Sequence, residues 1–198
     1  PCPGPVTADL SVLRPYQLEA VQAAIKKGRG IIQIPTGGGK TITASGIIKS
    51  FPVYWTFIVH RSGLMYQTAE RFKEQGIDGV GILGDGKVEP GSHVTVTTFQ
   101  TMWAQLRTPV VQDILARTQG LIVDEVHTLP GQTWSQVASA FGAAQYRFGL
   151  SGTPLDRSDQ RSLITVGAIG PIIHRTGAEV LVNAGVRAKP NIRMVRVE

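Results

Sequence analysis

The feature that most restricts the fold of this chain is a short apolar stretch followed, after Pro-Thr, by three consecutive glycines. Residues 30–34 have the composition of a buried strand, and a Pro-Thr-Gly-Gly-Gly segment follows them. Glycines let the backbone N–H groups of such a loop converge on one anion, and a helix that begins after the loop adds the positive end of its dipole. A Lys-Thr pair at the end of the loop supplies an ammonium for phosphates and a hydroxyl for Mg²⁺.

This stretch predicts a cradle for the phosphates of ATP or GTP. The residues that we expect to surround the phosphates are Pro35, Thr36, Gly37, Gly38, Gly39, Lys40 and Thr41. The alternative is a glycine turn between a strand and a helix that binds no ligand.

Strand-like and helix-like segments alternate along the rest of the chain. Strands are predicted at 30–34, 54–59, 80–83, 94–97, 120–124, 147–150 and 172–175, and helices at 15–28, 40–50, 62–75, 110–117, 133–141, 159–166 and 178–188. Several of the strand segments are apolar throughout, which is typical of strands covered on both faces by helices. The order therefore predicts a doubly wound α/β domain with a mostly parallel central sheet and helices on both faces.

Composition narrows the class of protein further. The chain has 198 residues, 42% of them hydrophobic, which is enough for one domain with a substantial core. Its formal net charge of +6 favours a polyanionic partner. With Cys2 as the only cysteine no internal disulfide is possible, and no apolar run is long enough to cross a bilayer. We expect a soluble, intracellular, cytoplasmic protein without a membrane partner. Because it begins at Pro1 rather than Met, we also expect a piece of a longer protein.

A pair of acids at the tip of another apolar strand supplies what the phosphate loop lacks. Hydrolysis of a bound nucleotide needs a carboxylate for the metal ion and a group that orients the attacking water. Asp124 and Glu125 follow the apolar segment 121–123. Ligands of an α/β sheet gather beyond the carboxyl ends of its strands, so both acids are expected to face the same crevice as Lys40. We assign Asp124 to Mg²⁺, directly or through water, and Glu125 to the attacking water. The alternative is two solvated acids at a strand end.

These segments together resemble a known family. The Pro-Thr-Gly-Gly-Gly-Lys-Thr and Asp-Glu-Val-His segments are similar to motifs I and II of the DExH class of superfamily 2 helicases and translocases. Four further segments, 13–17, 57–67, 95–101 and 149–154, resemble the leading segment and motifs Ia, Ib and III, in the family's order. The combination is most similar to the group that contains XPB, UvsW and related double-stranded DNA translocases.

The resemblance implies a RecA-like P-loop NTPase domain over residues 13–188. Residues 1–12 are then a leader or linker, and 189–198 an exit strand toward a second RecA-like domain. The implied function is the ATP-binding first motor domain of an ATP-dependent DNA helicase or translocase, with ATP and Mg²⁺ as cofactors and DNA as partner. In this family the second domain brings arginines to the γ-phosphate, so we expect this chain alone to be a monomer with weak or no ATP hydrolysis. The alternatives are a motor of a restriction enzyme or of an RNA helicase, and a catalytically silent module that binds nucleic acid.

The resemblance also assigns roles to single residues on the nucleotide side. Gln17 is expected to read the adenine edge, while Arg14 and Tyr16 pack on the base. Lys40, Asp124 and Glu125 are the expected catalytic residues.

On the nucleic-acid side, motifs Ia and Ib are expected on the face opposite the ATP crevice. There Arg61, Thr97, Thr98 and Gln100 would hold the phosphates of one strand. The alternative for these polar residues is an ordinary role in strand ends and helix caps.

A coupling element is expected between the two sides. His127 would hydrogen-bond to the motif III hydroxyls of Ser151 and Thr153 and respond to the γ-phosphate. The alternative is a partly buried histidine with a purely structural hydrogen bond. Arg157 is a weaker candidate for a DNA or interdomain contact. We expect structural roles for His93 and His174, because no acidic or cysteine companion stands at metal-ligand spacing. The three tryptophans are also expected to pack, since one belongs to a buried strand and two lie in helix-like segments.

Overall fold

The computed structural model describes residues 9–128, 131–153 and 160–188, which form an eight-stranded sheet. The strands are β1 (Arg29–Gln33), β2 (Trp55–Val59), β3 (Val80–Gly84), β4 (Lys87–Glu89), β5 (Val94–Thr98), β6 (Gly120–Val123), β7 (Tyr146–Ser151) and β8 (Ile172–Arg175). Their order in the sheet is β4-β3-β5-β2-β6-β7-β1-β8, and within it only the β3–β4 pair is antiparallel. The predicted doubly wound α/β architecture with a mostly parallel sheet is confirmed.

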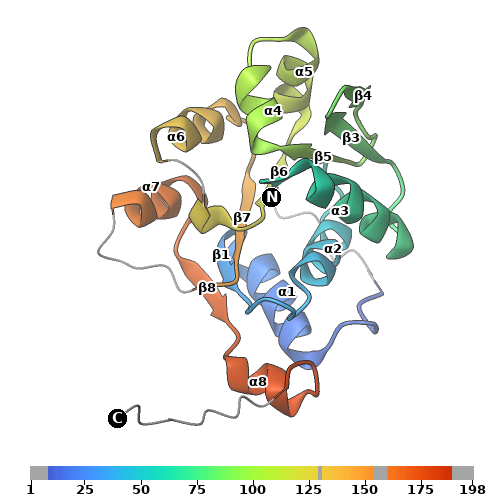
Figure 1. Ribbon diagram of the computed structural model, residues 1–198, viewed down its shortest axis with the longest axis vertical. Helices are drawn as coiled ribbons and strands as arrows, with labels where there is room; N and C mark the ends of the chain where they lie inside the picture. Colours follow the sequence, from blue (N-terminus) through green and yellow to red (C-terminus); the bar gives the residue numbers. More distant parts are fainter. Residues whose placement is uncertain (1–8, 129–130, 154–159, 189–198) are drawn as a thin grey trace, which may run out of the picture.

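Helices cover both faces of the sheet. They are α1 (Pro15–Lys27), α2 (Lys40–Ser50), α3 (Ser62–Glu74), α4 (Phe99–Ala104), α5 (Pro109–Arg117), α6 (Gly131–Ala140), α7 (Gln160–Ile169) and α8 (Ala178–Asn183), with a 3₁₀ turn η1 (Val126–Thr128). One apolar core lies under α1, α2 and α3, and a second lies under α4, α5, α6 and α7. Figure 1 shows α2 and α3 to the right of the strands and α6 and α7 to the left. In the described residues, no helix combines the length and the apolar character needed to span a bilayer.

Local sequence accounts for the principal elements. Pro15 occupies the first turn of α1, where its missing N–H costs nothing, and Gly28 closes that helix in the left-handed conformation with φ 72°. All five residues of β2 are buried, as are all five of β5, because helices pack on both sides of these strands. The turn before Lys87 is a two-residue hairpin loop in which Asp85 and Gly86 have positive φ angles.

Three elements were not predicted, and one helix is shorter than predicted. Strand β4 is exposed at every residue and therefore carries no hydrophobic pattern. Helix α4 has six residues, too few for a helical period to show, and η1 has three. The last helix was predicted to reach 188 but ends at Asn183, because the chain turns at Gly185, which has a φ of 67°. The predicted exit strand lies outside the described residues.

The carboxyl edge of the sheet brings the sequence motifs together. Strand β7 lies between β6 and β1, and its register pairs Ser151 with Gln33 at the end of β1. The phosphate loop, the acidic pair and motif III therefore follow three neighbouring strands. Motifs Ia and Ib follow β2 and β5, which are also neighbours and end together at Val59 and Thr98.

Candidate functional site

The phosphate loop after β1 is held in place by two side chains of α1. The Tyr16 hydroxyl and the Gln17 Nε2 each donate a hydrogen bond of 3.0 Å to the carbonyl oxygen of Gly38. Gly37 and Gly39 have φ angles of 84° and 80°, which favour glycine. A Cβ at Gly39 would lie 2.4 Å from the Gln17 Nε2, so the close approach of α1 requires glycine there. The first turn of α2 begins at Lys40 with backbone N–H groups that have no helical acceptor.

Gln17 contacts the phosphate loop in the nucleotide-free chain. Its side chain is buried, its Nε2 donates to Gly38, and its Oε1 accepts from the backbone N–H of Arg14 at 3.0 Å. Gln17 therefore joins the start of α1 to the phosphate loop, and its expected contact with the adenine edge stays a prediction. Tyr16 is buried beside it in the same role, and the exposed Arg14 donates from its Nη1 to the Tyr16 hydroxyl at 3.5 Å.

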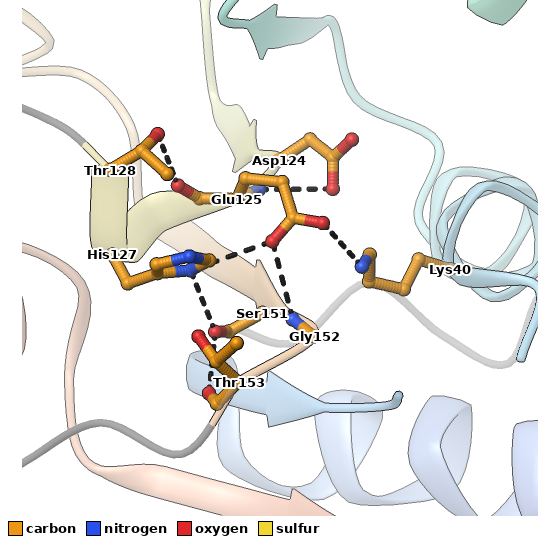
Figure 2. A network of polar contacts seen from close by, with 8 residues as sticks. All are labelled: Lys40, Asp124, Glu125, His127, Thr128, Ser151, Gly152 and Thr153. Carbon is orange, nitrogen blue, oxygen red and sulfur yellow. Dashed lines mark hydrogen bonds and ion pairs between the residues drawn. The ribbon is translucent and has the colours of Figure 1, made fainter. Parts of the chain in front are cut away.

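An ion pair joins the phosphate loop to the acidic pair. The Lys40 Nζ lies 2.5 Å from Glu125 Oε1, and the other oxygen of that carboxylate accepts the Gly152 N–H at 3.3 Å. Figure 2 shows Lys40 reaching Glu125 from the start of α2 while Gly152 approaches the same carboxylate from the end of β7. The expectation that the acids face the crevice of Lys40 is met. Burial raises the pKa of Glu125, but the hydrogen bond and charge of Lys40 outweigh it, so that pKa lies below its ordinary value.

A sharp backbone turn aims Glu125 at the lysine. Glu125 has a φ of 47°, in the left-handed region that non-glycine residues rarely adopt. The turn is fixed by Thr128, whose N–H and hydroxyl both donate to the Glu125 carbonyl at 2.8 Å. A backbone held in this region by surrounding bonds is typical of functional sites.

Asp124 and Thr41 line one cavity of about 310 Å³ together with Lys40 and the loop residues 36, 37 and 39. Burial, and next the charge of Glu125, raise the pKa of Asp124. Among the described residues no cluster of three His, Cys, Asp or Glu side chains could hold a metal ion alone. A carboxylate and a hydroxyl facing one cavity fit Mg²⁺, which takes few protein ligands and completes its shell with phosphates and water.

His127 makes the expected hydrogen bond to motif III. Its Nδ1 lies 3.0 Å from the Ser151 hydroxyl and 3.5 Å from Glu125 Oε2. The Ser151 hydroxyl donates its single proton to the carbonyl oxygen of Thr153 at 2.8 Å. Nδ1 is therefore the protonated nitrogen and donates to Ser151. Thr153 takes part through its backbone carbonyl, not through the expected hydroxyl.

A second, larger cavity of about 710 Å³ follows β2 and β5. It is lined by His60, Arg61, Ser62, Gly63, Leu64, Gln67, Asp85, Thr98, Gln100 and Thr101. Arg61 and Gln100 are exposed within it, as expected for residues that contact a phosphate chain. We call this cavity the groove.

Thr97 is placed differently from the other expected nucleic-acid contacts, whereas Thr98 lines the groove beside Arg61 and Gln100. Thr97 is fully buried, and its hydroxyl donates to the Thr98 carbonyl at 3.4 Å. Thr98 caps α4, because its hydroxyl accepts the Thr101 N–H at 3.1 Å. Thr97 therefore has no surface to offer to a phosphate, since every residue of β5 is covered on both sides.

The two cavities lie on one edge of the sheet, not on opposite faces. Leu64 and Gln67 of α3 line both the groove and the nucleotide cavity. The expectation that motifs Ia and Ib lie on the face opposite the ATP crevice is therefore wrong: they follow strands of the same sheet edge, and α3 stands between the two sites.

Comparison with known proteins places this site in a family. A protein-family model described as "Type III restriction enzyme, res subunit" matches residues 10–156, which include the phosphate loop, the acidic pair and motif III. The chain belongs to this family. The match begins at Leu10, which packs against the core although we expected a leader up to residue 12.

Relatives within this group of proteins carry helicase and translocase names. The chain is 35% identical over 179 residues to "DNA 3'-5' translocase XPB2" of Sulfurisphaera tokodaii, covering 90% of this chain and 39% of that protein. It is 30% identical to "Putative DNA 3'-5' helicase Rad25" of Halobacterium salinarum, covering 96% of this chain and 31% of that one. The chain thus spans less than half the length of these relatives. The expected resemblance to the XPB and UvsW group is confirmed.

A solved structure supports the same fold. The crystal structure of the UvsW helicase from bacteriophage T4 matches with a TM-score of 0.71 at 23% identity, covering 81% of this chain and 59% of that one. The RecA-like architecture expected from the motifs is thereby confirmed. Of the family motifs, the end of motif III and Arg157 lie outside the described residues.

Proposed function

We propose that this chain is the ATP-binding first motor domain of an ATP-dependent DNA helicase or translocase. The observation that carries the proposal is the contact of Lys40, Glu125 and Gly152 around the phosphate loop, made by residues that follow three neighbouring strands. Family membership and the names of the relatives support DNA as the track.

Lys40 and Glu125 neutralise each other in the nucleotide-free chain. An incoming phosphate competes for the Lys40 ammonium, because a phosphate offers more oxygens and more charge than one carboxylate. Once Lys40 turns to the phosphate, Glu125 is free to accept a hydrogen bond from the attacking water. The Gly152 N–H, which donates a hydrogen bond to the Glu125 carboxylate, keeps that carboxylate in place during this exchange.

Asp124 and Thr41 would hold Mg²⁺, which neutralises charge that develops on the phosphate oxygens. The raised pKa of Asp124 fits a carboxylate that is buried while it lacks a full set of positive partners.

His127 would couple the nucleotide to motif III. Its Nδ1–H is shared between Glu125 and Ser151. A change in the position of the Glu125 carboxylate therefore changes the hydrogen bond at Ser151, at the end of β7. A second RecA-like domain would bring the remaining arginines to the γ-phosphate, so hydrolysis by this chain alone would be weak.

The test compares ATP hydrolysis by the full-length protein with that of its Glu125→Gln variant, with and without duplex DNA. We expect duplex DNA to stimulate the wild type. The variant keeps nucleotide binding but loses about 10²- to 10⁴-fold in rate, the usual contribution of a general base. Glu74→Gln, at an exposed site on α3, is the matched control. Rates unchanged by DNA and by the Glu125 substitution would instead support a silent nucleic-acid-binding module.

The track is tested by salt-dependent binding to duplex DNA, single-stranded DNA and RNA. A motor that follows duplex DNA binds the duplex most tightly at equal salt, with a slope set by the number of phosphates it neutralises. Tighter binding to RNA would favour an RNA helicase.

A further inference from the structure

One helix of the chain contacts both cavities along a single face. Residues 61, 64, 67 and 71 are spaced three or four apart on or just before α3, so their side chains lie on one stripe of that helix. Arg61 lines only the groove, Leu64 and Gln67 line both cavities, and Arg71 lines only the nucleotide cavity. The stripe therefore runs from the nucleic-acid side to the phosphate loop and ends on a cation.

Arg71 is a cation without a partner in the described part of the chain. Its guanidinium makes no ion pair or hydrogen bond there, whereas Lys73 on the same helix pairs with Glu70. Arg107 is likewise unpaired among the described residues, but it lines neither cavity. Arg71 borders the one that also contains Lys40 and Thr41.

Hydrogen-bond donors dominate the wall of this cavity. Lys40 and Arg71 line it with two positive charges, and Asp124 is the one carboxylate among its lining residues. Glu125, which pairs with Lys40, is not among them. The hydroxyls of Thr36, Thr41 and Thr68 and the amide of Gln67 add hydrogen-bond donors. Such a donor-rich wall fits an anion with several oxygens, and a planar guanidinium can donate two parallel hydrogen bonds to one phosphate.

We propose that Arg71 is a further phosphate-binding residue of the nucleotide site, which contacts the outer phosphates of ATP from the α3 side, opposite the phosphate loop. This inference rests on the proposed function. It gives the first motor domain a cation of its own for the phosphate chain, in addition to Lys40. It also places that cation on the helix whose other end borders the groove. A shift of α3 would therefore change the contacts of both ligands.

The test is titration of the chain with fluorescent AMP, ADP and ATP in the presence of Mg²⁺. Arg71→Gln is expected to weaken ATP binding about tenfold or more, the effect of one hydrogen bond to a charged group. ADP binding is expected to weaken less, and AMP binding to stay unchanged, because AMP lacks the outer phosphates that Arg71 is proposed to contact. Arg71→Lys keeps the charge without the planar fork and is expected to recover part of the loss. Arg107→Gln is the matched control, because this exposed arginine precedes α5 and lines neither cavity.

The outcomes separate this inference from the proposed function. If Lys40→Ala weakens ATP binding while Arg71→Gln binds all three nucleotides as the wild type does, the inference is wrong and the proposed function stands. Equal losses for Arg71→Gln and Arg107→Gln would also overturn it, since they would report only the lost net charge. If the wild-type chain binds no nucleotide at millimolar concentration, both proposals fail.

Discussion

The nucleotide cavity and the groove lie on the same sheet edge, yet they are built in different ways. Around the nucleotide cavity, charged groups from separate strands already contact one another, and the Lys40–Glu125 pair is only 11% and 21% exposed. The groove is more than twice as large, at about 710 Å³ against 310 Å³, and its Arg61 and Gln100 are exposed. A site for chemistry needs groups fixed before the ligand arrives, whereas a site that follows a polymer backbone needs only a few donors along a surface.

The largest effect on binding is expected when the Lys40 cation of the nucleotide cavity is removed. Lys40→Ala leaves the nucleotide phosphates without their ammonium, so ATP affinity is expected to fall roughly 10- to 150-fold, the range for hydrogen bonds to charged groups. Nucleic-acid affinity is expected to stay at the wild-type value. Both are measured by titration of the same preparation, with Lys26→Ala on α1 as control. An equal loss of both affinities would show that the two regions are not independent.

Asp124→Asn is expected to weaken nucleotide binding in the presence of Mg²⁺ but not in its absence. It should also make the fold more stable at neutral pH, because burial and Glu125 raise the pKa of Asp124 in the folded chain. Above the folded pKa of Asp124, the buried negative charge lowers the free energy of unfolding. This cost disappears as the pH falls toward the unfolded pKa of about 3.8, because the carboxyl is then protonated in the folded chain.

This pH dependence is measured by denaturant unfolding of both proteins from pH 7 to pH 4. The stability advantage of Asp124→Asn should shrink as the pH falls, while Asp78→Asn, at an exposed site, should show no such trend. A constant difference across the range would mean that the Asp124 charge is not the cause.

In the groove, Arg61→Ala is expected to have a smaller effect. Loss of one phosphate contact lowers the slope of log affinity against log salt by about 0.9 for duplex DNA and weakens binding uniformly across sequences. The slope is obtained from titrations at several salt concentrations, and Arg107→Ala is the matched control. A slope that does not differ from that of the control would remove Arg61 from the interface.

The nucleotide site was largely predictable because each part of it is a contiguous segment. The phosphate loop and the acidic pair each follow an apolar run, and the rule that ligands gather at the carboxyl ends of parallel strands brings Glu125 to Lys40. The turn at Glu125 was not predicted, because a positive φ at a non-glycine residue leaves no compositional sign.

The sequence was less informative about residues whose contacts depend on packing between distant segments. Gln17 has the spacing of a helix-capping residue, which could have indicated an internal role, but its second partner, Gly38, is 21 residues away. Thr97 carries no alternation to reveal its burial, because all of β5 is covered. The place of Gln67 in both cavities is visible only once α3 is packed against β2, β3 and β5.

The smallest effects on nucleic-acid binding are expected at the two threonines that end β5. Thr98→Ala removes the cap of α4 and is expected to lower the free energy of unfolding by about 1 kcal/mol while nucleic-acid affinity stays unchanged. Thr97→Val fills the same buried volume without the hydroxyl and should also bind nucleic acid as the wild type does. Thermal unfolding and duplex titration measure both. If Thr97→Val folds normally yet binds duplex DNA more weakly, β5 must shift on binding to expose its end, and the groove would then be rearranged by its ligand.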